Sequence, residues 1–196
     1  MNKADVSPWP DLFIVKDFLA PDICREVVTE MDLAQGEAAR VYTRTTSTAV
    51  DQGIRQTLRL RPSHEIVELI KTRLLAQQPA LAEHFGVELT TGEEPQFLRY
   101  RVGDFFVAHQ DGNTGLLRLD TELRRVSLVI FLSRESELAQ PDTYCGGSLV
   151  FTNLRDGRKY SSPGEPDMLV AFRSETTHEV TPVTHGNRYS IVSWFR

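Results

Sequence analysis

The segment FFVAHQDGNTG, residues 105–115, places two ionisable side chains, His109 and Asp111, at the end of an apolar run. In an extended strand, residues two apart project from the same face, so the imidazole and the carboxylate would lie side by side. Together they offer one nitrogen and one oxygen ligand to a metal ion. A hydrogen-bonded His–Asp pair at a strand end would have the same sequence, so this spacing leaves both interpretations open.

A third ligand can be sought among the five histidines of the chain. His178 begins the extended run HEVTPV, which lies between two other predicted strands, so it can share a sheet with His109. His64, His84 and His185 fall in a first helical turn, near a helix end and in a turn, where we expect exposed side chains. Two histidines and one carboxylate on one face of an octahedron leave three positions open, which is typical of non-haem Fe(II) oxygenases.

Arg188 follows His178 by ten residues, in the predicted strand GNRYSIVSWF. Burying an arginine on a mostly apolar strand is unfavourable unless it meets an anion, and its planar guanidinium suits a carboxylate. Ser190 lies on the same strand face and could donate a further hydrogen bond. A surface arginine paired with one of the 27 acidic residues is the competing interpretation.

The second half of the chain is typical of a β-protein. Seven extended runs are separated by turn signals and cover residues 96–102, 104–110, 124–133, 147–151, 167–172, 178–183 and 187–195. Many short strands at regular intervals favour a jelly roll or sandwich.

The first half is predicted to support these strands. It contains a strand over 12–18, a helix over 20–34 and a clear amphipathic helix over 62–78, with a further turn that ends at Gly86. Helices of this kind need a sheet to bury their apolar faces. We therefore expect a mainly β, α+β fold and a single domain over 1–196, with 1–90 as helical and strand support and 91–196 as the core.

Composition excludes several classes of function. The chain is 40% hydrophobic and 25% charged with a net charge of -5, and it has no run of lysine or arginine, so we expect no nucleic-acid partner. No stretch approaches the roughly 20 apolar residues of a membrane span, and we expect a cytoplasmic protein. Cys24 and Cys145 lie far apart in unlike contexts and are predicted to be free thiols. The sequence does not indicate an oligomeric state.

The order of these motifs resembles a known family. The pattern YxxGxxxxxHxD at Tyr100, Gly103, His109 and Asp111 precedes GGSLVF at 146–151, and DMLVAF, HEVTPV and GNRYSIVSWF follow. This set resembles the Fe(II)/2-oxoglutarate-dependent oxygenases of the prolyl 4-hydroxylase type over roughly residues 95–196. The opening LFIVKDFLAPDICREVV is also similar to the strand and helix that begin this family.

The resemblance implies a double-stranded β-helix, a jelly roll of the cupin-like kind. It implies that Fe(II) is held by His109, Asp111 and His178. It also implies that Arg188 binds the distal carboxylate of 2-oxoglutarate, with Ser190 and Tyr100 at the co-substrate. Weaker candidates for substrate contact are Trp194 and Arg55, the latter from IRQT at residues 54–57.

One position departs from the family pattern. Some prolyl hydroxylases carry a tyrosine in the strand after the HxD loop that helps to hold the distal carboxylate, and Ile130 stands there in the best alignment. Ser190 or another hydroxyl would therefore have to serve. We expect Phe105, Val107 and Leu149 to form apolar walls beside the metal.

The activity implied by the resemblance is hydroxylation of an unactivated C–H bond, above all of a prolyl residue in a peptide or protein. Fe(II), 2-oxoglutarate and O2 would be required, succinate and CO2 would be released, and ascorbate is a candidate reductant. The same chemistry on a free amino acid or small metabolite, or another oxidation at the same site, is an alternative.

Two other classes of function also remain open. One is a non-catalytic jelly-roll module that binds a ligand, and the other is a cupin isomerase or dioxygenase that ignores 2-oxoglutarate. Whichever class applies, the loops 42–53 and 112–124 are expected to shape the entrance to the site, because loops on a rigid sheet usually carry specificity.

Overall fold

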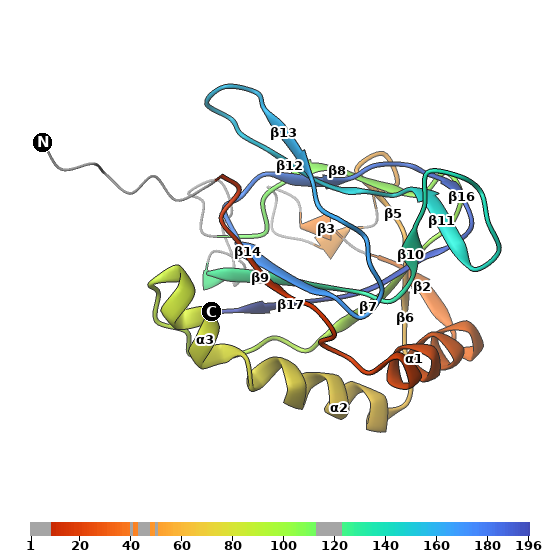
Figure 1. The fold of residues 1–196 in the computed structure, drawn as a ribbon, viewed down its shortest axis with the longest axis horizontal. Coiled ribbons are helices and arrows are strands. Elements are labelled where there is room, and N and C mark those ends of the chain that lie inside the picture. Colours follow the sequence, from red (N-terminus) through yellow and green to blue (C-terminus); the bar gives the residue numbers. More distant parts are fainter. Residues whose placement is uncertain (1–8, 40, 43–47, 50, 113–122) are drawn as a thin grey trace, which may run out of the picture.

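The computed structural model describes residues 9–39, 41–42, 48–49, 51–112 and 123–196. Two antiparallel sheets lie face to face, and the helices cover the outer face of the larger sheet (Figure 1). The described helices are α1 (Pro21–Leu33), α2 (His64–Leu75) and α3 (Gln78–Phe85). This arrangement confirms the predicted mainly β jelly roll with N-terminal helices.

The larger sheet has seven strands among the described residues. In spatial order they are β1 (Leu12–Val15), β14 (Leu169–Arg173), β9 (Val126–Phe131), β17 (Arg188–Phe195), β7 (Gln96–Tyr100), β6 (Leu58–Leu60) and β2 (Gly36–Ala38).

The smaller sheet has five described strands and carries part of the candidate site. In spatial order they are β13 (Lys159–Ser161), β12 (Leu149–Thr152), β15 (His178–Val180), β8 (Phe105–His109) and β5 (Arg55–Gln56). A third sheet joins β10 (Arg134–Glu135), β11 (Thr143–Gly146) and β16 (Val183–His185), and β3 (Val41–Tyr42) pairs with β4 (Thr48–Ala49). In the second half of the chain, β10, β11 and β13 lie wholly outside the predicted runs.

Alternation along β9 explains how the layers pack. Leu128 and Ile130 point into the apolar core beneath the helices, whereas Val129 and Phe131 point into the core between the two sheets. Every residue of β9 is therefore buried. On the neighbouring β17, Ile191 likewise faces the helices. The remaining alternate positions of β17 are thus available to the space between the sheets.

The helices lie where the sequence places them, although α2 ends at Leu75 and residue 78 already belongs to α3. The side chain of Ser63 caps α2 by accepting a hydrogen bond from the backbone N–H of Ile66 at 3.4 Å. Pro21 occupies the first turn of α1, and α3 ends next to Gly86. In the described part of the chain, no helix combines the length and the apolar character that a membrane span requires. Cys24 and Cys145 are free thiols, as predicted.

Segments that precede residue 90 extend both sheets. Strands β1, β2 and β6 belong to the larger sheet, and β5 lies at the edge of the smaller one. Because the first half completes the sheets as well as covering them, we propose that residues 1–196 form one domain, with 1–90 as its support.

Candidate metal centre

Strands β8 and β15 bring two histidines together across one ladder. His109 is the last residue of β8 and pairs directly with His178, the first residue of β15. Asp111 lies just beyond β8, which ends one residue before the end of the predicted run 104–110. One ligand atom from each of His109, Asp111 and His178 lies within 4.8 Å of the others. Each histidine Nε2 is 3.5 Å from an oxygen of Asp111.

Backbone carbonyls orient both imidazoles. His109 Nδ1 lies 2.8 Å from the carbonyl oxygen of Val107, and His178 Nδ1 lies 2.9 Å from that of Thr176. A carbonyl only accepts, so each Nδ1 carries the proton and donates it. The lone pair of each Nε2 is then directed toward Asp111, which is the tautomer that a metal ligand requires.

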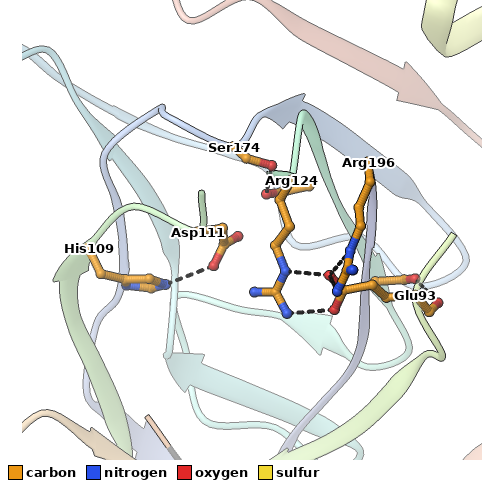
Figure 2. A network of polar contacts seen from close by, with 8 residues as sticks. Glu93, His109, Asp111, Arg124, Ser174 and Arg196 are labelled. Carbon is orange, nitrogen blue, oxygen red and sulfur yellow. Dashed lines mark hydrogen bonds and ion pairs between the residues drawn. The ribbon is translucent and has the colours of Figure 1, made fainter. Parts of the chain in front are cut away.

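Asp111 is held in place by its backbone after the strand has ended. Its N–H and that of Gly112 donate to the carbonyl of Ser174 at 2.9 and 3.2 Å. The Ser174 hydroxyl in turn shares a 2.9 Å hydrogen bond with Ser127 at the start of β9 (Figure 2). Asp111 is therefore anchored to the larger sheet, whereas His109 and His178 lie on the smaller one.

Burial and mutual charge set the protonation state of the cluster. Burial, and after it the neighbouring His109, lowers the pKa of His178 to about 4. Burial by itself would raise the pKa of Asp111, but His178, His109 and Arg124 together hold it well below its usual range. At neutral pH, His178 is therefore neutral and Asp111 is charged, as metal coordination demands.

The aromatic wall beside the histidines differs from the one that alternation predicts. The ladder shifts register, so that His109 opposes His178 while Phe106 opposes Val180. Three steps along β8 thus match two along β15, as in a β-bulge. The bulge stacks the ring of Phe106 on His109 with centroids 3.5 Å apart. Phe106 therefore forms the apolar wall that was expected from Phe105 and Val107, and Val107 is 39% exposed.

His178, on β15 of the smaller sheet, packs against a second aromatic ring. Phe172 lies edge-on to His178 with centroids 4.7 Å apart. Leu149 is buried with Phe151 and Phe172 in the core between the sheets. The triad therefore has apolar side chains on two sides, which limits access of water.

Arg188 is a buried cation that has no acidic partner in the part of the chain that the structure describes. It is 1% exposed and, among the described residues, forms no ion pair with a carboxylate. Its Nη1 donates to Ser190 Oγ at 2.7 Å, and its guanidinium carbon lies 5.2 Å from the ring centroids of both Tyr100 and Phe131. Its Nε has no hydrogen-bond partner among the described residues. Such a group requires an anion, and a carboxylate from a small molecule fits it.

The expected co-substrate residues thus come together, with one correction. Tyr100 pairs with Arg188 across β7 and β17, and Ser190 bonds to the guanidinium. Ile130, however, points toward the helices, and the β9 residue that faces Arg188 is Phe131. The aligned position of Ile130 therefore does not belong to the pocket.

One polar residue of this pocket was not predicted from the sequence. Tyr144 on β11 is fully buried, and its hydroxyl has no hydrogen-bond partner among the described residues. Burial raises the pKa of this phenol to about 12, although the nearby Arg188 acts in the opposite direction. The available signal was a tyrosine two residues before Gly146–Gly147, but β11 itself was not predicted.

The two residues proposed for substrate contact each approach the triad through an intervening side chain. The guanidinium of Arg55, which is buried, lies 4.8 Å from the ring centroid of Phe106, the ring that stacks on His109. Arg55 also lines a cavity of ≈ 270 Å³ together with Gln52, Thr57, Arg101 and Asp104.

Trp194 is buried under the guanidinium of Arg124, which lies 3.7 Å from its ring. Arg124 makes a two-pronged ion pair with Glu93 at 2.8 and 2.6 Å, and its guanidinium lies between Asp111 and Glu93 (Figure 2). Trp194 is therefore linked to the triad through Arg124.

The remaining expectations concern histidines and loops. His64, His84 and His185 are exposed, as predicted. Much of the loops expected to shape the substrate entrance, residues 43–47, 50 and 113–122, lies outside the described residues.

Comparison with known proteins gives a consistent result. Residues 95–196 match the family model described as 2OG-Fe(II) oxygenase superfamily. A PKHD-type hydroxylase of Shewanella sp. (strain ANA-3) is 31% identical over 137 residues, which are 67% of this chain and 54% of that protein. The chain thus spans about half the length of the curated relatives it matches.

Solved structures share the fold. A Pseudomonas putida prolyl-4-hydroxylase superimposes with a TM-score of 0.71 at 24% identity, covering 95% of this chain and 92% of that one. A prolyl hydroxylase from Trichoplax adhaerens, solved with a hypoxia inducible factor peptide fragment, gives 0.69 at 19% identity and covers 94% and 83%. These similarities support the double-stranded β-helix assignment.

Proposed function

This chain belongs to the 2OG-Fe(II) oxygenase superfamily, and on that premise we propose that it hydroxylates an unactivated C–H bond, using Fe(II), 2-oxoglutarate and O2. One observation carries the proposal. The His109, Asp111 and His178 cluster and the cation of Arg188, which no described carboxylate neutralises, border the same space between the sheets. Phe172 contacts His178, Phe131 lies beside Arg188, and both rings belong to one apolar core.

Each part of the site has a distinct role in this proposal. His109, Asp111 and His178 hold Fe(II), and Arg188 with Ser190 receives the distal carboxylate of 2-oxoglutarate, with Tyr100 beside it. The bound metal and co-substrate supply oxygen activation, with release of succinate and CO2. Two imidazoles and one carboxylate would leave coordination positions of the metal open for co-substrate and oxygen.

The protein itself positions the reactants and excludes water. The carbonyls of Val107 and Thr176 hold both imidazoles in the ligating tautomer. Phe106 and Phe172 pack against these rings and shield them. The hydrogen bond from Arg188 to Ser190 fixes the guanidinium before the co-substrate arrives, which reduces the entropy lost on binding.

We infer that the substrate is a prolyl residue in a peptide or protein. The PKHD-type relatives and the prolyl hydroxylases of the same fold support this choice, and one of the latter was solved with a bound peptide. The cavity lined by Arg55 offers a place for residues that flank the reacting one, because Arg55 is separated from His109 only by the ring of Phe106.

The test uses the purified protein loaded with Fe(II) under anaerobic conditions. Addition of 2-oxoglutarate should produce the visible metal-to-ligand charge-transfer band, and air should then yield succinate. Succinate release is compared between proline-containing peptides, free amino acids and small acids. Absence of both the band and succinate would contradict the oxygenase proposal.

Arg188→Ala separates this proposal from a cupin enzyme that ignores 2-oxoglutarate. We expect the variant to lose the 2-oxoglutarate-dependent band while it still binds metal. Stimulation of succinate release by free amino acids instead of peptides would move the substrate to that class and leave the cofactor chemistry in place.

A further inference from the structure

Tyr144 and Arg188 converge on Gly147. A side-chain carbon at Gly147 would lie 3.1 Å from Cδ of Arg188 and 3.3 Å from Cε2 of Tyr144. The two side chains, from β17 and β11, are thus neighbours around one glycine, and both are fully buried. A larger residue at position 147 would push the two side chains apart. It would also strain the backbone, because Gly147 has a φ of +61°.

Each of these two neighbours has one polar atom without a partner among the described residues. The Tyr144 hydroxyl and Arg188 Nε are both buried without a hydrogen bond among the described residues. Buried polar groups are nearly always paired, so two orphan donors side by side indicate a missing acceptor. The high pKa of Tyr144, about 12, keeps its hydroxyl protonated and able to donate at neutral pH.

The nearby carboxylate of Glu135 is not the acceptor that the Tyr144 hydroxyl lacks. A side-chain carbon at Gly164 would lie 2.5 Å from the Tyr144 hydroxyl and 2.6 Å from Glu135 Oε2, so Glu135 is close. Its other oxygen accepts a hydrogen bond from the Ser148 hydroxyl. The phenol nevertheless makes no hydrogen bond to Glu135. Its proton therefore remains available for an anion at Arg188.

We propose that Tyr144 helps to bind 2-oxoglutarate, its hydroxyl donating a hydrogen bond to the distal carboxylate that Arg188 receives. The assignment rests on the proposed function and deepens it. It also supplies the hydroxyl that β9 lacks, because Phe131 faces Arg188 from that strand and Ile130 points away.

Tyr144→Phe removes the hydroxyl alone. In Fe(II)-loaded protein kept anaerobic, titration of the charge-transfer band should show 2-oxoglutarate binding weakened by roughly tenfold or more, as expected for loss of a hydrogen bond to a charged group. Titration with 2-oxobutyrate, which has no distal carboxylate, should give equal affinities for the variant and the wild type. Tyr160→Phe, at a half-exposed tyrosine of β13, is the matched control and should change neither titration.

The stability of the ligand-free protein gives a second readout. Because the hydroxyl is buried and no described residue pairs with it, its removal should leave the melting temperature unchanged or raise it. A purely structural tyrosine would instead lower the melting temperature and weaken both 2-oxo acids alike, which would overturn the assignment. An unchanged affinity for 2-oxoglutarate would overturn it as well and leave the oxygenase proposal intact. Absence of any band in the wild type would overturn both.

Discussion

His109 and His178 are directly opposed across the β8–β15 ladder, with ring centroids 4.2 Å apart and planes tilted by 53°. The β-ladder thus determines the separation of the two rings, and a backbone carbonyl bound to each Nδ1 determines its orientation. A metal ion would meet two preformed nitrogen ligands on a rigid sheet. Asp111, anchored to Ser174, completes the group.

His178→Ala should weaken metal binding strongly, because it removes one of three ligands from a site that has no described substitute. We expect the dissociation constant for Fe(II) or Mn(II) to rise by about 100-fold or more, in line with the loss of a ligand or of its support. Anaerobic calorimetry measures it. His185→Ala, at an exposed histidine of β16, should have no effect, and an equal loss in both variants would argue against the assigned triad.

Stability of the metal-free protein should fall as pH decreases from about 6.5 toward 4. The pKa of His178 is lowered from 6.5 to about 4 in the folded protein, so in this window the unfolded chain binds a proton that the folded chain does not. The slope of the unfolding free energy with pH is at most about 1.4 kcal/mol per pH unit, and this slope vanishes below the pKa of the folded state. Urea unfolding in the presence of a chelator at pH 6.5, 5.5 and 4.5 measures it.

The comparison with His178→Ala isolates this effect. The wild-type stability should decline toward low pH more steeply than that of the variant. The lowered pKa of Asp111 adds its own loss only at lower pH, because its ordinary value is 3.8. Parallel pH profiles for the two proteins would contradict the assignment of the slope to His178.

Arg188→Met should separate stability from function. The arginine is buried and no described residue supplies a counter-anion, so an unbranched apolar side chain of similar length removes that charge. We expect the free energy of unfolding of the ligand-free protein to stay the same or to increase. Binding of 2-oxoglutarate should fall by about 100-fold or more, as for loss of a buried charge partner. A loss of several kcal/mol of stability by urea unfolding would mean that Arg188 is chiefly structural.

Glu93→Gln should destabilise the fold far more than Glu165→Gln. The Arg124–Glu93 pair has side-chain exposures of 7% and 18%, whereas both partners of the Arg134–Glu165 pair are 55% exposed. Removing one charge of a buried pair leaves the other uncompensated and costs about 3 kcal/mol, while an exposed pair contributes less than about 1 kcal/mol. Urea unfolding compares them. Equal effects would show that Glu93 does not neutralise Arg124.

Local patterns predicted much of this molecule. The i, i+4 spacing and the Ser63 cap specify α2, and the two-residue alternation of β17 predicts that Arg188 and Ser190 share a face, as the hydrogen bond between them shows. Such patterns depend on residues that are neighbours along the chain. The family resemblance, which rests on motifs in a particular order along the sequence, is what joined the distant His178 to the pair His109 and Asp111.

Other features depend on how separate strands align, which no local pattern specifies. Because of the bulge in β8, Phe106 packs on His109 in place of the expected Phe105 and Val107. The register of β9 turns Ile130 away from the pocket and Phe131 toward it. Tyr144 reaches Arg188 because β11 packs near the start of β17 across a glycine. Strand register and side-chain burial are products of the assembled core, so the partners of the buried cation are decided only when the sheets are in place.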